Sequence, residues 1–281
     1  MQVVWFKKDL RVEDHAPLLL ASKKGVVLPL YIVEPKLWSQ PDSSKRQYDF
    51  LQECVTELDV QLQALGQSLV VRVGEAQAVL EKIHAQQPIT NLWSHQETGN
   101  DWTYQRDRAV GQWAKNMGIT WHESPSNGVV RRLKTRDGWA AKWAQTMRRP
   151  PYNQPTCLEG CEVESEPWPT ASQLGLPEDG CLQRQSGGRT QGLAILDSFL
   201  NSRGEGYQKK MSSPLTAFTA CSRLSAHFTY GTLSMREVWH ITHARTRMVA
   251  ALPSEQKKTW PQDLRAFNAR LRWRCHFIQK L

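Results

Sequence analysis

The residues best suited to binding a ligand form a short segment in the C-terminal part of the chain. This segment consists of Cys221, Ser222, Arg223, Leu224 and Ser225. Two hydroxyl groups, a guanidinium group and backbone amides at a helix turn together suit the two phosphates of a pyrophosphate. Tyr207 follows two glycines and precedes two lysines, so it could place a ring or a hydroxyl beside the same ligand. Such residues also cap helices and occupy ordinary loops, so the segment alone leaves both roles open.

A second set of residues lies on one face of the last predicted helix. Arg270, Trp273, Arg274 and Phe277 are spaced at i, i+3, i+4 and i+7. Two cations beside an exposed indole suit a nucleic-acid strand, because the indole stacks on a base while the cations bind phosphate. The alternative is that Trp273 packs against another helix and the arginines extend into solvent. The spacing is compatible with both arrangements.

The positive charge of the chain is concentrated in the same C-terminal region. Residues 203–281 contain 14 Lys and Arg against 4 Asp and Glu, whereas residues 1–202 contain 22 against 23. The formal net charge of +9 therefore belongs to the C-terminal region. Charge confined to one region favours a phosphate-bearing partner, either nucleic acid or a nucleotide cofactor. The alternative is a solvated basic face without a partner.

The first 130 residues alternate short β-rich runs with longer amphipathic runs. We predict strands at Val3–Phe6, Val26–Val33, Leu69–Val73, Ile89–Trp93 and Ile119–His122. We expect Asp14 to cap the first intervening helix and Ser44 to cap the second. This alternation predicts an α/β fold, a five-stranded parallel doubly wound domain over residues 1–130. The segment after the first strand, Lys7–Arg11, contains no glycine, which excludes the glycine-rich dinucleotide turn.

Residues 131–189 are predicted to form an interdomain linker, because much of this stretch is proline-rich, acidic and poor in aliphatic side chains. Residues 190–281 have helical periodicity throughout and predict an all-α domain. Its helices are expected at Leu193–Leu200, Leu215–Phe228, Met235–Met248 and Leu264–Leu281. The last helix has no terminating glycine or proline and its apolar stripe reaches Leu281, so we expect an incomplete helical domain.

The cysteines indicate a reducing environment and give little support for a metal. Six cysteines occur without a secretory signal, so we expect free thiols and a cytoplasmic protein. Cys157, Cys161 and Cys181 lack paired C-x-x-C spacing and a nearby histidine, so no metal is expected. The chain has no run of 18 apolar residues, and no membrane partner is expected.

Several motifs in order along the chain resemble the photolyase/cryptochrome flavoproteins. They are Trp5–Asp14, Gly187–Gly188, Tyr207, Ser222–Ser225, Gly231–Val238 and Leu271–Arg274. The resemblance extends over nearly the whole chain, which corresponds to the first half to two thirds of a typical member. It implies an antenna-type α/β domain, a linker, and the N-terminal part of a helical FAD-binding domain. The antenna pigment and the oligomeric state are not implied.

The resemblance also implies roles for individual residues. In the family, the residues matching Tyr207, Ser222, Arg223 and Ser225 hold the phosphates and ribose of FAD, and the tryptophan matching Trp273 stacks on the pyrimidine dimer. Four positions depart from the family's pattern. Cys221 replaces a threonine, which weakens one phosphate contact, and Ala226 and Met235 replace prolines. Arg270 stands where DNA-repairing members carry a glutamate that contacts the pyrimidine dimer.

Three functions follow from these observations. The first is light-driven electron transfer from FAD, either for pyrimidine-dimer repair as a deoxyribodipyrimidine photo-lyase, a carbon–carbon lyase, or for blue-light sensing. In that case we expect the chain as given to retain FAD weakly or not at all, with catalytic residues not assignable before Leu281. The second is a non-catalytic nucleic-acid-binding remnant that lacks a complete flavin site. A nucleotide-binding module that uses only the α/β domain is the third, and the basic helical region disfavours it.

Overall fold

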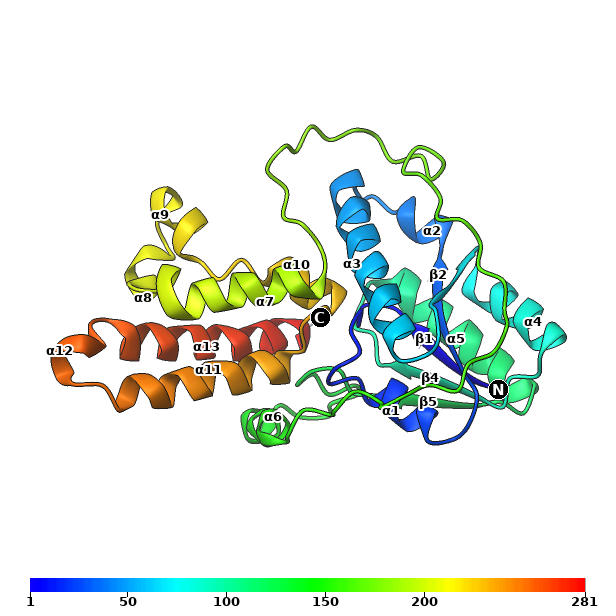
Figure 1. The fold of residues 1–281 in the computed structure, drawn as a ribbon, viewed down its shortest axis with the longest axis horizontal. Coiled ribbons are helices and arrows are strands. Elements are labelled where there is room, and N and C mark those ends of the chain that lie inside the picture. The colour runs from blue at the N-terminus through cyan, green and yellow to red at the C-terminus, as the bar shows by residue number, and fades with distance from the viewer. Residues whose placement is uncertain (281) are drawn as a thin grey trace. The chain divides into compact units, whose positions relative to one another are not determined.

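A five-stranded parallel sheet forms from the short β-rich runs of the first 124 residues (Figure 1). Its strands are β1 (Gln2–Phe6), β2 (Val27–Val33), β3 (Val70–Val73), β4 (Asn91–His95) and β5 (Thr120–Ser124). The strand order is β3-β2-β1-β4-β5, and Val3 of β1 lies opposite Leu28 of β2 and Leu92 of β4. Every residue of β1 and β2 is buried, as expected when helices cover both faces. The predicted α/β class and sheet are therefore confirmed.

The structure is a computed structural model, and it describes residues 1–280. These residues fall into two units. Unit 1 comprises residues 1–124, 152–188 and 230–232, and unit 2 comprises residues 125–151, 189–229 and 233 onward. The predicted end of the last apolar stripe, at Leu281, lies outside the described residues.

The helices of unit 1 are α1 (Ala16–Ser22), α2 (Pro35–Trp38), α3 (Lys45–Ala64), α4 (Ala76–Gln86) and α5 (Asp101–Asn116). Helices α4 and α5 share one apolar core with the sheet, which includes Trp5, Leu30, Leu80 and Val110. Helix α1 contacts β1, β4 and β5 through a set of buried residues that lies outside this core. The long helix α3 buries seven side chains between Tyr48 and Leu62.

The first helix does not begin as predicted. His15, not Asp14, is its N-cap, because the Nδ1 atom of His15 accepts the Leu18 N–H at 3.1 Å. Asp14 has a left-handed backbone (φ +48°), and its carboxylate accepts the Tyr152 N–H at 3.0 Å. The carboxylate of Asp14 is therefore engaged by a distant segment and does not cap the helix.

Residues 152–188 pack against the rest of unit 1 along the edge strand β3. The Val71 N–H donates to Ser165 Oγ at 3.0 Å, and the Glu166 N–H donates to the Val71 carbonyl at 2.9 Å. The Tyr48 hydroxyl donates to the Pro169 carbonyl at 2.6 Å. An edge strand with unpaired backbone groups invites association with another chain, so this proline-rich segment covers the exposed edge of the sheet.

Unit 2 is helical, as predicted. Its elements are α6 (Trp139–Arg148), α7 (Arg189–Ser198), the π-helix η1 (Phe199–Arg203), α8 (Tyr207–Lys210), α9 (Pro214–Ala220), α10 (Ser225–Tyr230), α11 (Met235–Ala250), α12 (Ser254–Lys257) and α13 (Trp260–Ile278). Leu196, Phe199, Val238 and Phe267 belong to its apolar core. Among the described residues, no helix is both long and apolar enough to cross a membrane.

Two elements of unit 2 differ from the sequence prediction. The single helix expected at Leu215–Phe228 is two short helices, α9 and α10, separated at residues 221–224. Helix α6 forms inside the segment 131–189, where only a linker was predicted. Trp139, Trp143 and Met147 give α6 a buried stripe at four-residue spacing, and the prolines that suggested a linker begin only after this helix.

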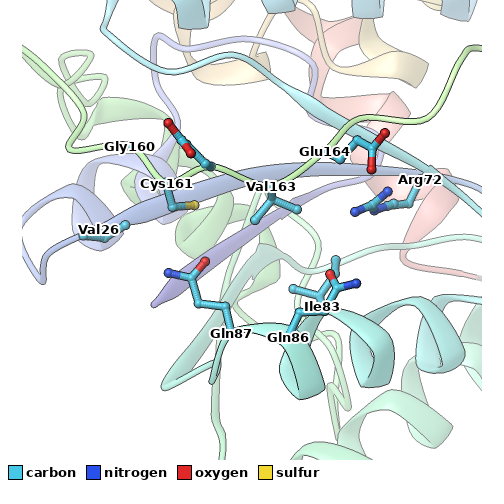
Figure 2. Close-up of a pocket in the computed structure, with 10 residues that line it drawn as sticks. Val26, Arg72, Ile83, Gln86, Gln87, Gly160, Cys161, Val163 and Glu164 are labelled. Atoms are coloured by element: carbon cyan, nitrogen blue, oxygen red, sulfur yellow. The ribbon is translucent and has the colours of Figure 1, made fainter.

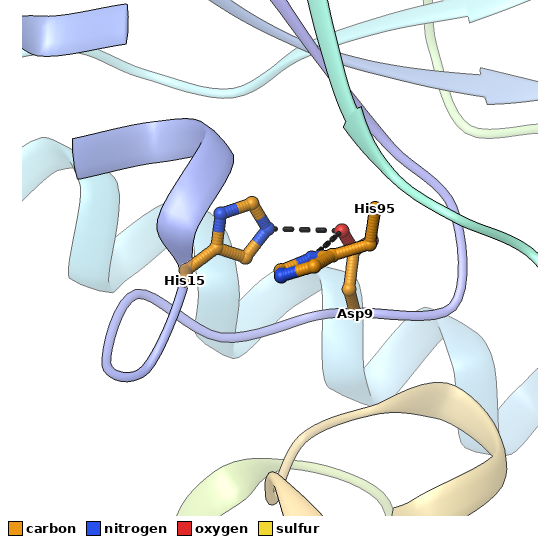
Figure 3. Close-up of side chains that lie close together, drawn as sticks. All are labelled: Asp9, His15 and His95. Carbon is orange, nitrogen blue, oxygen red and sulfur yellow. Dashed lines mark hydrogen bonds and ion pairs between the residues drawn. The ribbon is translucent and has the colours of Figure 1, made fainter. Parts of the chain in front are cut away.

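A buried carboxylate holds together the segment that follows β1. Asp9 Oδ2 accepts hydrogen bonds from His15 Nε2 at 3.0 Å and from His95 Nδ1 at 2.7 Å (Figure 3). Because Nδ1 of His15 already accepts the Leu18 N–H, the proton of this ring lies on Nε2. Burial lowers the pKa of both imidazoles, that of His95 to about 3, and the charge of Arg11 lowers both further. The two hydrogen bonds explain why these three side chains converge, and they need no metal ion.

The same segment binds the turn at residues 230–232. The Arg11 guanidinium donates to the Gly231 carbonyl at 2.7 Å, and the Leu10 N–H donates to the Tyr230 carbonyl at 3.0 Å. Gly231 has φ +67°, and a Cβ atom built on it would lie 2.3 Å from the Lys8 carbonyl oxygen. Glycine is therefore required at this position both by backbone conformation and by close approach of two chain segments.

The buried histidines predict a specific pH dependence of stability. A histidine whose pKa is depressed on folding contributes stability that is full above pH 6.5 and is lost as the pH falls toward 3. In His95→Asn the amide keeps a donor near the Nδ1 position but cannot titrate. We expect the free energy of unfolding of the wild type to fall more steeply below pH 6.5 than that of His95→Asn, by up to about 1.4 kcal/mol per pH unit.

Urea unfolding followed by tryptophan fluorescence between pH 8 and pH 4 measures this difference. The partly exposed His84 on α4 supplies the control variant, His84→Asn. Equal pH slopes for the wild type and His95→Asn would contradict a neutral buried His95.

Gly231 provides a second stability test. Gly231→Ala should destabilise the protein by about 2–4 kcal/mol, about 1 from the left-handed backbone and about 1–3 from the clash with the segment after β1. Gly118 has a similar φ of +69° with nothing within 4 Å of a built Cβ. Gly118→Ala should therefore cost only about 1 kcal/mol. Similar unfolding midpoints for the two variants would show that the close approach at Gly231 adds nothing to the cost of the substitution.

Candidate functional site

The predicted phosphate-binding segment lies at the break between α9 and α10. Leu224 is fully buried and anchors the segment, whereas Ser225 is exposed and Ser222 is half-buried. Arg223 has a left-handed backbone (φ +62°), and its guanidinium carbon lies 4.5 Å from the centre of the Phe218 ring. Cys221 packs against the core of unit 2. The segment is therefore a fixed loop that presents polar groups at the surface of the unit.

Tyr207 is held rigidly in the helical core. It begins α8, its ring is only 6% exposed, and it packs edge-to-face against Phe199 at 5.3 Å. Asp263 fixes the backbone on either side, because its carboxylate accepts the Gly206 N–H at 2.7 Å and the Gln208 N–H at 2.8 Å. Sequence reasoning missed Asp263, although an acidic residue in the first turn of α13 is a recognisable signal.

Arg270 connects the two predicted sets of site residues. Its guanidinium carbon lies 4.3 Å from the centre of the Trp273 ring, and its Nη2 atom lies 3.7 Å from Met211 Sδ. Burial raises the pKa of the Tyr207 hydroxyl, while the charge of Arg270 and a hydrogen bond from it act in the opposite direction. Arg270, assigned to DNA from the sequence, therefore lies beside Tyr207, which was assigned to the cofactor.

Trp273 and Arg274 occupy different environments on α13. The side chain of Trp273 is 44% exposed, and its ring packs edge-to-face on Phe277, which is 55% exposed. Arg274 donates to the Phe228 carbonyl at 3.1 Å, and burial lowers the pKa of its guanidinium. The exposed face thus contains Arg270, Trp273 and Phe277, while the side chain of Arg274 is held by its hydrogen bond to the Phe228 carbonyl.

Unit 1 contains a separate cluster of charged side chains at the carboxyl ends of its strands. This is the edge at which open parallel sheets bind ligands, at the point where the strand order reverses, here between β1 and β4. Arg106 bridges Glu34 and Glu97, and Lys7 binds Asp107 at 3.0 Å. All five side chains are at most 13% exposed. Side chains of the protein itself therefore fill this position.

The two carboxylates that bind Arg106 have opposite pKa shifts. Burial raises the pKa of Glu34 to about 7, because it outweighs the charge and the hydrogen bond of Arg106 and the nearby charge of Glu97 raises the pKa further. Glu97 is surrounded by Arg106, Lys7 and Lys8, and these three cations outweigh burial and lower its pKa to about 2. This asymmetry indicates a charge network that is balanced internally and does not require an external ion.

A cavity of about 490 Å³ lies at another place in unit 1, beside the segment that covers the sheet edge (Figure 2). Its lining residues are Val26, Arg72, Ile83, Gln86, Gln87, Gly160, Cys161, Glu162, Val163 and Glu164. The Nη1 atom of Arg72 lies 3.5 Å from Oε1 of Glu166, so the charge of Arg72 is already paired. None of the residues predicted to bind a cofactor or DNA lines this cavity.

Comparison with known proteins adds evidence on the family. The family model for DNA photolyase matches residues 2–149. A deoxyribodipyrimidine photo-lyase of Agrobacterium fabrum is 27% identical over 98% of this chain and 58% of its own length. A Synechocystis cryptochrome structure aligns with a TM-score of 0.80 at 21% identity, over 99% of this chain and 60% of that one.

A photolyase structure from Sulfolobus tokodaii, solved with two FAD molecules, has a TM-score of 0.69 at 22% identity. It aligns over 89% of this chain and 56% of that one. The chain therefore spans somewhat over half the length of the relatives it matches. The family model covers more than half of the chain, and the neighbours share its fold. The chain belongs to the photolyase/cryptochrome family of proteins.

Proposed function

We propose that this chain carries the phosphate-binding side of a FAD site and serves a light-driven flavoprotein of the photolyase/cryptochrome type. Because the chain spans 58% of the photo-lyase it matches, the activity of a whole photolyase belongs to this proposal. The Sulfolobus structure with FAD supports a flavin cofactor by analogy. The observation that carries the proposal is the grouping of Tyr207, Arg270 and the loop 221–225 in one helical unit.

The residues present suit a pyrophosphate. Burial lowers the pKa of Arg203, and the nearby positive charge of Arg223 lowers it further, so these two guanidinium groups repel each other. Arg270 adds a third cation close to Tyr207, whose pKa also responds to Cys221 of the loop. An anion of two or more charges placed among these groups would relieve their repulsion and gain charge-assisted hydrogen bonds.

Each residue would have a distinct role toward the bound cofactor. Arg223 and the hydroxyls of Ser222 and Ser225 would donate hydrogen bonds to phosphate oxygens, and the rigid ring of Tyr207 would limit how the cofactor can turn. Leu224, fully buried, would keep the loop in register. When bound, FAD supplies light absorption and electron transfer, while the chain supplies orientation, burial and positive charge.

The exposed indole of Trp273 supports DNA as the partner. A pyrimidine dimer turned out of the duplex loses its stacking, and an exposed tryptophan restores part of that energy. The basic balance of residues 203–281 would hold the phosphate backbone. Arg270 lies against Tyr207 and over Trp273, which fits a role toward the cofactor better than one in reading bases. Two functions therefore stay within this proposal: repair of the bound dimer, and light sensing without repair.

Arg223 provides the test of the cofactor proposal. Calorimetric titration of the chain with FAD and with ADP should give weak but saturable binding of both nucleotides. Arg223→Ala should weaken this binding by about 1.5–3 kcal/mol, the range for a hydrogen bond to a charged group. Arg265, an exposed arginine on α13 whose Nε donates to the Pro261 carbonyl, gives the control Arg265→Ala.

The control should bind both nucleotides as the wild type does. If Arg223→Ala and the wild type have the same dissociation constant, Arg223 is not in a phosphate site. If DNA binds while neither nucleotide does, the non-catalytic nucleic-acid-binding alternative is correct.

Trp273 provides the test of the DNA proposal. Trp273→Ala should weaken binding to single strands containing a pyrimidine dimer by about 1–3 kcal/mol, because a stacking platform is lost. Met248, also exposed but on α11, supplies the control Met248→Ala. Fluorescence anisotropy with damaged and undamaged oligonucleotides at several salt concentrations measures both the stacking and the phosphate contribution.

A loss confined to damaged strands would support a repair-type site. An equal loss for both strands would support general binding by stacking. No loss with Trp273→Ala, or binding that is indifferent to salt, would contradict the assignment of this face to DNA.

A further inference from the structure

Helix α7 continues into a π-helix immediately before the candidate cofactor site. The π-helix η1 covers Phe199–Arg203, and α8 with Tyr207 follows after three residues. π-helical turns are rare, and they frequently lie at functional sites. The residue that ends this turn is Arg203, which was not singled out by sequence reasoning. Its side chain points toward the loop between α9 and α10 and contacts the backbone there.

Arg203 donates hydrogen bonds from all three of its nitrogen atoms. Nε donates to Ser198 Oγ at 2.9 Å, within its own helical segment. Nη1 donates to the Thr219 carbonyl at 2.9 Å and to the Cys221 carbonyl at 2.7 Å. Nη2 donates to the Ile195 carbonyl at 3.1 Å and makes a longer contact of 3.5 Å with the Ser222 carbonyl. One guanidinium group therefore joins α7 and η1 to the loop.

These contacts determine which way the loop amides face. In a trans peptide unit the C=O and N–H groups point in opposite directions. Because the carbonyls of Cys221 and Ser222 turn toward Arg203, the N–H groups of Ser222 and Arg223 point away from it. Successive amides beside a left-handed residue form a concave arrangement that binds anions, and Arg223 has φ +62°. The carbonyl groups of the loop thus face Arg203, and the N–H groups of the loop face away from it.

We propose that Arg203 is a positioning residue, which sets the conformation of residues 221–225 and thereby their affinity for the pyrophosphate of the cofactor. This inference rests on the proposed function. Arg203 does not need to contact the cofactor, since its donors are taken by carbonyl and hydroxyl oxygens. Its charge lies behind the loop and adds to the attraction of an anion on the other side. A lysine could not replace it, because one ammonium group cannot reach carbonyls on both segments in a planar fork.

The test compares Arg203→Lys with a matched variant of another arginine that binds a backbone carbonyl in the same unit. Arg245 on α11 donates to the Leu200 carbonyl at 3.0 Å and lies over the Trp260 ring. Arg245→Lys therefore removes a similar interaction with η1 and leaves the loop 221–225 untouched. Three measurements are made on the full chain: hydrogen exchange of the Cys221 amide, binding of ADP, and binding of adenosine. Thermal unfolding shows whether either variant loses its fold.

Arg203→Lys should accelerate exchange of the Cys221 amide, which donates to the Ala217 carbonyl at 3.0 Å, by about tenfold or more, since a network of hydrogen bonds to a charged group is lost from the loop. It should weaken ADP binding by about tenfold or more and leave adenosine binding unchanged, because only the pyrophosphate uses the loop. Arg245→Lys should change none of these values. Equal effects of the two variants, or an equal loss of affinity for ADP and for adenosine, would show that Arg203 has only a general structural role and would overturn the proposal.

The exchange measurement separates this inference from the proposed function. If the wild-type chain binds no ADP, the cofactor proposal fails, and the ligand part of this inference fails with it. The positioning part is then decided by exchange alone. Faster exchange of the Cys221 amide with Arg203→Lys supports it, and unchanged exchange overturns it.

Discussion

The burial of charge is the physical constraint on which most of this structure depends. A charged side chain taken out of water must be paired or hydrogen-bonded, and otherwise it costs several kcal/mol. In this protein the partners are often backbone groups of loops. Asp9 and Arg11 hold the segment after β1. Asp263 accepts the Gly206 N–H at the start of α8, and the partly buried Arg203 donates to the Cys221 carbonyl in the loop before α10. These charges therefore bind stretches of chain at the ends of the regular elements.

This arrangement explains why a motif that identifies the family can have a structural role. The segment Trp5–Asp14 is one of the motifs that resemble the family, and its polar residues bind other parts of the chain. Asp9 binds two histidines, Arg11 binds the Gly231 carbonyl, and Asp14 binds Tyr152. The motif therefore assembles unit 1, while the residues proposed to contact FAD and DNA lie in unit 2. Removal of one partner would leave an unpaired buried charge, which accounts for the demand for these residue types.

The sheet and the helical region could be predicted from the sequence because hydrophobic periodicity is a local signal. The five strands and the cap at Ser44 followed from it, with boundaries shifted by one or two residues. The break in Leu215–Phe228 could not be predicted in this way, because the contacts made there are not local: Arg203 binds carbonyls 16 and 18 residues away. Similarly, the pairing of Asp9 with His95 joins two strand ends 86 residues apart. The position of Arg270 beside Tyr207 also requires the packing of α13 against α8.

The most direct test of the central claim is an experimental structure of the chain with FAD or ADP bound. We expect the pyrophosphate to lie against the loop 221–225, with oxygens within hydrogen-bonding distance of Arg223 and of Ser222 or Ser225. Arg203 should keep its bonds to the carbonyls of Thr219 and Cys221 behind that loop. A nucleotide whose phosphates bind elsewhere, for example in the cavity beside Arg72 in unit 1, would contradict the claim that the helical unit holds the cofactor.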